Sequence, residues 1–135
     1  MTTRLTRHIT APRSDVYRAL LDPVAVVHWK VPPGMTSEVH EWDAREGGRL
    51  RVSLTYSGYF AELVPDQKVV EVDEFETDDP ALRGPMTITV TLADAEDGGT
   101  ELVAVHEGLP SGVREEDNEL GWTESLTRLA ALVES

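Results

Sequence analysis

The residues of this sequence that could do chemistry are a carboxylate and an imidazole near the ends of two predicted strands. Glu74 follows Val70 and Val72 at alternating positions of one strand, and His106 ends a similar series on another. Successive side chains of a strand point to opposite faces, so each polar group could share a face with apolar neighbours. Facing one cavity, the two could act as general base and acid, or orient a ligand's hydroxyl or carbonyl group. The opposite register would place Phe75 inside instead of Glu74.

Other kinds of catalytic or metal site have little support in the sequence. The chain has no cysteine, which excludes thiolate nucleophiles, disulfides and cysteine-based zinc sites. No Gly-x-Ser-x-Gly elbow occurs, and Gly47-Gly48 is better read as a turn than as a phosphate cradle. The histidines form no His-x-His or His-Glu-x-x-His pattern: His8, His28, His40 and His106. We therefore expect no metal and no cofactor.

Length and charge restrict the partners of the chain. Its 135 residues suit one domain, residues 1–135. The formal net charge of -13 would repel phosphate backbones and anionic lipids, so neither nucleic acid nor a membrane is an expected partner. The N-terminus lacks the apolar run of a signal peptide, and no window approaches the ~20 apolar residues that span a bilayer. These features favour a cytoplasmic location.

The elements that must position the candidate side chains begin with one strand and two short helices. Alternation over residues 3–10 predicts the strand. Pro12 suits the first turn of a helix, where its missing N–H is not needed. Asp22-Pro23 resembles a cap followed by a first helical residue, which predicts a second short helix as far as about Trp29.

From residue 35 the apolar period becomes two, which is typical of an antiparallel meander. The predicted strands cover residues 35–43, 48–57, 59–64, 67–76, 86–94 and 100–107. Turns are predicted at Gly47-Gly48, Ser57-Gly58, Pro65-Asp66 and Asp97-Gly98-Gly99. Two strands have a plain buried face, formed by Leu50, Val52, Leu54 and Tyr56 in one and by Met86, Ile88, Val90 and Leu92 in the other.

A long helix is predicted from about residue 114 to 134, or ~30 Å at ~1.5 Å per residue. Its apolar stripe comprises Trp122, Leu126, Leu129 and Val133. We expect Trp122 to be largely buried against the sheet. Gly121 needs a reason, because a glycine inside a helix costs roughly 1 kcal/mol relative to alanine. The backbone could approach the sheet or a ligand closely there, or the glycine could mark an irregular first turn.

An acidic cluster covers the end of the predicted strand 67–76 and the residues after it. It comprises Glu71, Asp73, Glu74, Glu76, Asp78 and Asp79. It could be a docking surface for a basic partner, but we favour a solvated edge that keeps the sheet from pairing with another sheet.

Several fragments, taken in order, resemble the START-like (helix-grip, SRPBCC) superfamily, in particular its branch of heat shock protein 90 ATPase activator homologues. The resemblance covers essentially the whole chain. It rests on Ala11-Pro12 to Val16, Trp29, residues 44–50, Gly58-Tyr59-Phe60 to Pro65, Gly99-Thr100 to His106-Glu107-Gly108-Leu109, and Gly121-Trp122 with Leu126 and Leu129.

This resemblance implies an α+β helix-grip fold. A curved antiparallel sheet of about six to seven strands would wrap around the long C-terminal helix, with two short helices after the first strand. The superfamily includes lipid carriers, polyketide cyclases, hormone receptors and chaperone cofactors, so the fold alone does not select one activity.

We therefore expect a small-molecule binding domain, with a mainly apolar or aromatic ligand held between the sheet and the C-terminal helix, and we favour a non-enzymatic role. The expected ligand contacts are Trp29, Leu54, Tyr56, Phe60, Met86, Ile88, His106, Trp122 and Leu126. One alternative is a polyketide cyclase-like or hydrolase-like enzyme that uses Glu74 and His106. Another is a protein-interaction module, such as a chaperone cofactor or a homodimer.

Overall fold

The computed structural model describes residues 2–30, 38–52 and 56–134. These residues form one seven-stranded antiparallel sheet, in the order β1-β7-β6-β5-β4-β3-β2, and three α-helices. The strands are β1 (Thr2–Ile9), β2 (Val39–Trp42), β3 (Arg49–Val52), β4 (Tyr56–Val64), β5 (Lys68–Phe75), β6 (Met86–Asp94) and β7 (Thr100–Glu107). The helices are α1 (Arg13–Leu21), α2 (Pro23–Trp29) and α3 (Glu115–Glu134), and a short 3-10 helix spans Pro80–Leu82.

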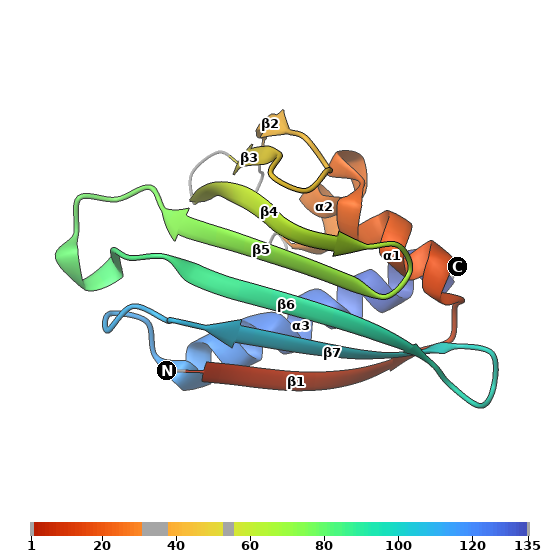
Figure 1. Ribbon diagram of the computed structural model, residues 1–135. Helices are drawn as coiled ribbons and strands as arrows, with labels where there is room; N and C mark the ends of the chain where they lie inside the picture. Colours follow the sequence, from red (N-terminus) through yellow and green to blue (C-terminus); the bar gives the residue numbers. More distant parts are fainter. Residues whose placement is uncertain (1, 31–37, 53–55, 135) are drawn as a thin grey trace.

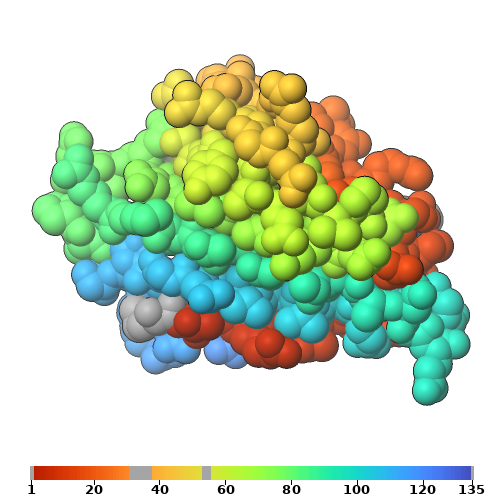
Figure 2. All heavy atoms as spheres, viewed as in Figure 1, coloured from red at the N-terminus to blue at the C-terminus, as the bar shows by residue number. Residues whose placement is uncertain are grey.

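The predicted α+β helix-grip fold is confirmed. The sheet curves around α3, which runs along its inner face behind β6 and β7 in the view of Figure 1. Helix α3 also contacts β1, α1 and α2. Figure 2 shows that side chains of β4 to β7 cover the opposite, outer face of the sheet, and that the turn between β6 and β7 projects from the body. None of the described helices is both long and apolar enough to cross a membrane.

The start of α2 follows from its first residues. The Asp22 carboxylate accepts a hydrogen bond of 2.9 Å from the backbone N–H of Val24, which would otherwise have no helical partner. Pro23 takes the first helical position, where a backbone N–H would have no partner within the helix, so its absence in proline costs nothing. The predicted start of this helix is confirmed.

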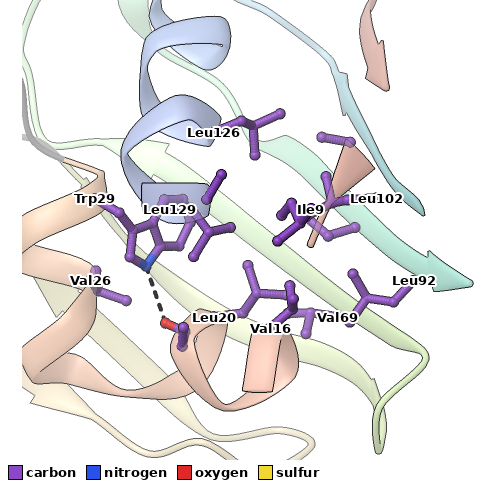
Figure 3. Packing of buried hydrophobic residues seen from close by; sticks show 14 of the residues in the cluster. Ile9, Val16, Leu20, Val26, Trp29, Val69, Leu92, Leu102, Leu126 and Leu129 are labelled. Atoms are coloured by element: carbon purple, nitrogen blue, oxygen red, sulfur yellow. Dashed lines mark hydrogen bonds between the residues drawn. The ribbon is translucent and has the colours of Figure 1, made fainter. Parts of the chain in front are cut away.

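The main core lies where the helices meet the inner face of the sheet. Leu126 and Leu129 of α3 are fully buried and face Ile9 and Leu102 of the sheet (Figure 3). Trp29 is 2% exposed, and its indole N–H donates a hydrogen bond of 3.1 Å to the carbonyl of Ala19. Burial of these large side chains is what holds the helices against the sheet.

The predicted turn at Ser57-Gly58 is wrong. Both residues lie inside β4, where Ser57 pairs with Glu74 and Gly58 pairs with Asp73 of β5. A Cβ atom added at Gly58 would collide with the backbone carbonyl of Val72. The glycine therefore permits a close approach of two strands, which is the other common use of glycine in a strand.

The acidic cluster is not an edge of the sheet. Strand β5, which carries Glu71, Asp73 and Glu74, is the central strand of the seven. Glu71 and Asp73 are 4% and 2% exposed, and only Glu74 of the strand's three acidic residues reaches solvent. The interpretation of this segment as a solvated edge is therefore wrong for its buried members, which face the helices.

Candidate functional site

A pocket of about 260 Å³ lies between the inner face of the sheet and residues 117–128 of α3. Its walls come from three parts of the chain. The residue after α2 contributes Lys30, and strands β4 to β7 contribute Tyr56, Asp73, Phe75, Met86, Ile88 and His106. Helix α3 contributes Asp117, Asn118, Gly121, Trp122, Glu124, Ser125 and Arg128.

The structure brings together five of the predicted ligand contacts at this pocket: Tyr56, Met86, Ile88, His106 and Trp122. Three others, Trp29, Phe60 and Leu126, are buried in the hydrophobic core and do not line it. Leu54 lies outside the described residues.

The predicted pairing of Glu74 with His106 is wrong. Glu74 is exposed and lies on the outer face of the sheet, beside Tyr59 and Val72. His106 is 6% exposed and faces the pocket. The register of β5 is the alternative one, with Phe75 on the pocket side, because alternation carries Glu71 and Asp73 inward with it.

One face of α3 forms the mouth of the pocket. Asn118, Gly121, Ser125 and Arg128 are separated by three, four and three residues, so they share a face of the helix. Gly121 lies well inside α3, which excludes an irregular first turn. A Cβ atom added at Gly121 would meet no atom within 4 Å, so close contact with the sheet is excluded too. The glycine leaves open space on the helix face that borders the pocket.

A buried ion pair closes the inner end of the pocket. The ammonium group of Lys30 lies 3.2 Å from the Glu71 carboxylate, and the two side chains are 15% and 5% exposed. The same Lys30 nitrogen lies 5.5 Å from the ring centre of Trp29 and 5.3 Å from that of Tyr56. Burial alone would lower the pKa of Lys30, but the charge of Glu71 and the hydrogen bond to it outweigh burial and raise that pKa. Lys30 is therefore a cation at neutral pH.

Asp73 is a buried carboxyl group close to the carboxyl group of Glu71. Neither of its side-chain oxygens accepts a hydrogen bond from the described residues. Burial and the neighbouring charge of Glu71 raise the pKa of Asp73 to about 9, against a smaller lowering effect of Lys30. Asp73 is therefore protonated at neutral pH and places a carboxyl O–H group at the inner end of the pocket.

Tyr56 supplies a second donor nearby. Its hydroxyl oxygen is buried and makes no hydrogen bond with the described residues. Burial raises the pKa of Tyr56, so the group remains a neutral phenol at neutral pH. A buried polar group without a hydrogen-bond partner lowers the free energy of unfolding by roughly 1–3 kcal/mol, so its presence indicates a functional role such as ligand binding.

His106 is fixed by three neighbours. The Trp122 indole N–H donates to His106 Nδ1 at 3.0 Å, and the Asn118 amide nitrogen lies 3.3 Å from the same atom. The proton of the neutral ring is therefore on Nε2, which lies 3.2 Å from the sulfur of Met86. Burial, with the charge of Lys30, lowers the pKa of His106 to about 4. His106 is thus a neutral ring that orients Trp122, and it is poorly suited to act as a general base at neutral pH.

Lys30, Glu71 and Asp73 are the polar residues of this region that sequence reasoning missed. Their signal was present in β5, where Val69, Glu71, Asp73 and Phe75 alternate on one face. Two apolar residues at the ends of that series were evidence for an inward face, which places the two carboxyl groups inside as well.

Replacing Asp73 with asparagine should stabilise the protein, and the gain should grow with pH. Folded Asp73 holds a proton up to a pKa of about 9, whereas the unfolded side chain releases it near 3.8. The unfolded state thus binds fewer protons over this window, so this group lowers stability as pH rises. An asparagine side chain has the same shape and no proton to release. We expect Asp73→Asn to raise the free energy of unfolding by roughly 1–3 kcal/mol near neutral pH and by little in acid.

Urea unfolding across this pH range measures the effect. Glu74→Gln is the matched control, since Glu74 is the exposed neighbour on the same strand, and it should change stability little at any pH. A gain from Asp73→Asn that does not grow with pH would contradict a protonated Asp73.

Comparisons with known proteins give matches over almost the whole chain. The family model described as activator of Hsp90 ATPase homolog 1-like protein matches residues 10–134. The solved structure of protein CV1439 from Chromobacterium violaceum is 41% identical, with a TM-score of 0.91, and the match covers 99% of this chain and 97% of that one. No protein of curated function matches the sequence.

More distant structures share the fold. Protein MLL2253 from Mesorhizobium loti is 21% identical, with a TM-score of 0.81 over 99% of this chain and 97% of that one. CalU16 from Micromonospora echinospora is 20% identical, with a TM-score of 0.76 over 98% of this chain and 75% of that one. At these identities the likeness shows the fold alone.

Proposed function

The chain belongs to the family of activator of Hsp90 ATPase homolog 1-like proteins, and from the pocket between its sheet and α3 we propose that it binds a small, mainly apolar molecule there. The observation that carries this proposal is Gly121. A helix-interior glycine costs about 1 kcal/mol relative to alanine, and this exposed glycine borders the pocket, where an added Cβ atom would meet no atom within 4 Å.

The composition of the walls supports an apolar ligand. Most of the wall surface is apolar, with Phe75, Met86, Ile88 and Trp122 contributing to it, while polar side chains lie both at the inner end and along the face of α3. Ligand sites are commonly mainly apolar, with a small number of polar groups that fix orientation. A pocket of about 260 Å³ suits a molecule of one or two rings, since an engineered cavity of ~150 Å³ already holds benzene.

Thermal shift with a panel of fatty acids, sterols and aromatic polyketides tests the proposal. A ligand present at a hundred times its Kd should raise the free energy of unfolding by ~2.7 kcal/mol. If no member of the panel, and no single-ring aromatic compound, shifts the melting temperature, the proposed function is wrong.

Filling the pocket from α3 should abolish binding while the fold is kept. In Gly121→Leu the new side chain has room, because no atom lies within 4 Å of the added Cβ. The substitution should also remove the helix cost of glycine and so stabilise by up to about 1 kcal/mol. We expect ligand affinity to fall at least about tenfold, since an overlap that costs about 1.4 kcal/mol of binding is enough.

Glu119→Leu is the matched control for this variant. Glu119 is exposed on the same helix and does not line the pocket, so a leucine there should leave affinity unchanged. Equal affinity of Gly121→Leu and Glu119→Leu would show that the ligand binds elsewhere.

The family description favours a second candidate, contact with the chaperone Hsp90. This role predicts that the protein increases the rate of ATP hydrolysis by Hsp90. Gly121→Leu, which is a change at the pocket, should then leave that stimulation intact. The two candidates are therefore separable with one variant.

A further inference from the structure

We propose that the pocket recognises a ligand through a single neutral oxygen, a ketone or enol oxygen, which receives hydrogen bonds from both the Tyr56 hydroxyl and the Asp73 carboxyl group. This inference rests on the proposed function and adds the chemical class of the ligand. It is carried by two buried side chains that line one pocket and whose oxygen atoms make no hydrogen bond with the described residues.

The register of β4 and β5 brings the two groups together. Gly58 pairs with Asp73, and Tyr56 is the next residue of β4 on the same face. Because Gly58 has no side chain, the Asp73 carboxyl group leans across it: one carboxyl oxygen lies 2.5 Å from the place where a Gly58 Cβ would be. Asp73 thus extends toward β4, on the side from which the Tyr56 ring projects.

Both groups are donors, and the charges around them cancel. Asp73 is protonated and Tyr56 is a phenol. The cation Lys30 is already paired with Glu71, so the inner end of the pocket carries no net charge that would favour an anionic ligand. The N–H of His106 is directed at the sulfur of Met86 and does not compete for the ligand.

This pair of donors suits a carbonyl oxygen. A carbonyl oxygen has two lone pairs and can accept two hydrogen bonds at once. A tyrosine hydroxyl and a carboxylic acid kept neutral by an apolar site form one known type of oxyanion hole. The apolar walls would hold the hydrocarbon body of the same ligand.

The test compares acetophenone with ethylbenzene, which has nearly the same shape and lacks the oxygen. The measured quantity is the ratio of the ethylbenzene Kd to the acetophenone Kd, determined by thermal shift for each protein. Comparing this ratio between variants removes the difference in hydrophobicity of the two probes. In Tyr56→Phe we expect the ratio to fall about tenfold, the effect of losing one hydrogen bond in an apolar site.

Tyr59→Phe is the matched control. Tyr59 lies on the same strand, is 45% exposed and faces away from the pocket. The ratio should therefore equal that of the unaltered protein. A ratio that falls equally in both variants would contradict a role for the Tyr56 hydroxyl and overturn the proposal.

A second measurement tests Asp73. As the pH is raised through about 9, Asp73 loses its proton and becomes an acceptor, so the ratio should fall. In Asp73→Asn the side-chain amide still donates and does not titrate, so the ratio should stay constant over the same range. The other charged groups at the pocket, namely Lys30, Glu71, Asp117, Glu124 and Arg128, are present in both proteins, and so is neutral His106.

The outcomes separate this proposal from the function on which it rests. If both probes bind, compete with each other and are excluded by Gly121→Leu, but Tyr56→Phe leaves their ratio unchanged, the oxygen-binding pair is wrong and the apolar ligand site stands. If neither probe binds and no apolar ligand of the wider panel binds, both proposals are wrong.

Discussion

Lys30→Met should destabilise the protein by about 3–5 kcal/mol, the usual effect of removing one partner of a buried ion pair. The Lys30 ammonium is the only cation that the structure describes in contact with Glu71, at 3.2 Å, and Glu71 is 4% exposed. Methionine keeps the length and the apolar part of the lysine side chain. The loss would therefore come from leaving the Glu71 carboxylate buried without a compensating charge. Chemical denaturation of the variant and the unaltered protein measures it.

Two further variants show whether burial is the cause. Arg51→Met removes the cation of an ion pair with Glu76, whose side chains are 55% and 37% exposed, and should cost at most about 1 kcal/mol. Lys30→Met combined with Glu71→Met removes both buried charges and should recover most of the loss. If Lys30→Met costs no more than Arg51→Met, the Glu71 carboxylate is solvated when Lys30 is absent, and the ion pair is not needed to hold the fold.

The strands with unbroken alternation could be predicted closely. The predicted ranges 86–94 and 100–107 coincide with β6 and β7, and the even-numbered residues of β6 from Met86 to Leu92 are buried as expected. Period-two alternation is a local property of the sequence, and one buried face is enough to fix it. Helical spacing is also a local property of the sequence, and it predicted the apolar stripe of α3, of which Trp122, Leu126 and Leu129 are buried.

The Ser57-Gly58 pair inside β4 shows where local patterns mislead. Serine followed by glycine is a common turn pair, so the sequence predicted a turn at Ser57-Gly58. In the fold, Gly58 is required because the backbone of β5 passes too close for a Cβ atom. A glycine in a strand and a glycine in a turn look the same in a sequence. The neighbouring strand that distinguishes them becomes visible only once the sheet is assembled.

The polar inner end of the pocket could not be predicted from the sequence for a different reason. Carboxylates are rarely buried unless they are paired, so the sequence alone favours solvent for Glu71 and Asp73. The partner that changes this balance is Lys30, 41 residues away in the sequence from Glu71, at the end of α2. No spacing rule connects the two positions. His106, by contrast, lies on an apolar strand alternation and Trp122 on an apolar helix stripe, so both could be assigned to the pocket from the sequence.

Trp122→Ala should cost about 3–5 kcal/mol of stability, a large share of the ~5–15 kcal/mol that holds an ordinary domain together. Trp122 is 9% exposed and belongs to the core that joins α3 to the sheet. Its indole N–H is also hydrogen-bonded to His106, with the two rings in an edge-to-face contact at 6.1 Å. Alanine would remove the packing, the ring contact and the hydrogen bond together.

The same substitution should also weaken ligand binding, because one side of the Trp122 ring faces the pocket. Trp122→Phe separates the two contributions. It retains an aromatic ring against the core and loses the donor to His106, so we expect a cost of about 1 kcal/mol, the usual worth of one hydrogen bond. Measuring the melting temperature and the ligand Kd for both variants resolves the roles of the residue. If Trp122→Ala left stability unchanged but weakened binding, the ring would be pocket wall alone. If it changed neither quantity, α3 would not be docked through this residue, and the position of the pocket beneath the helix would be wrong.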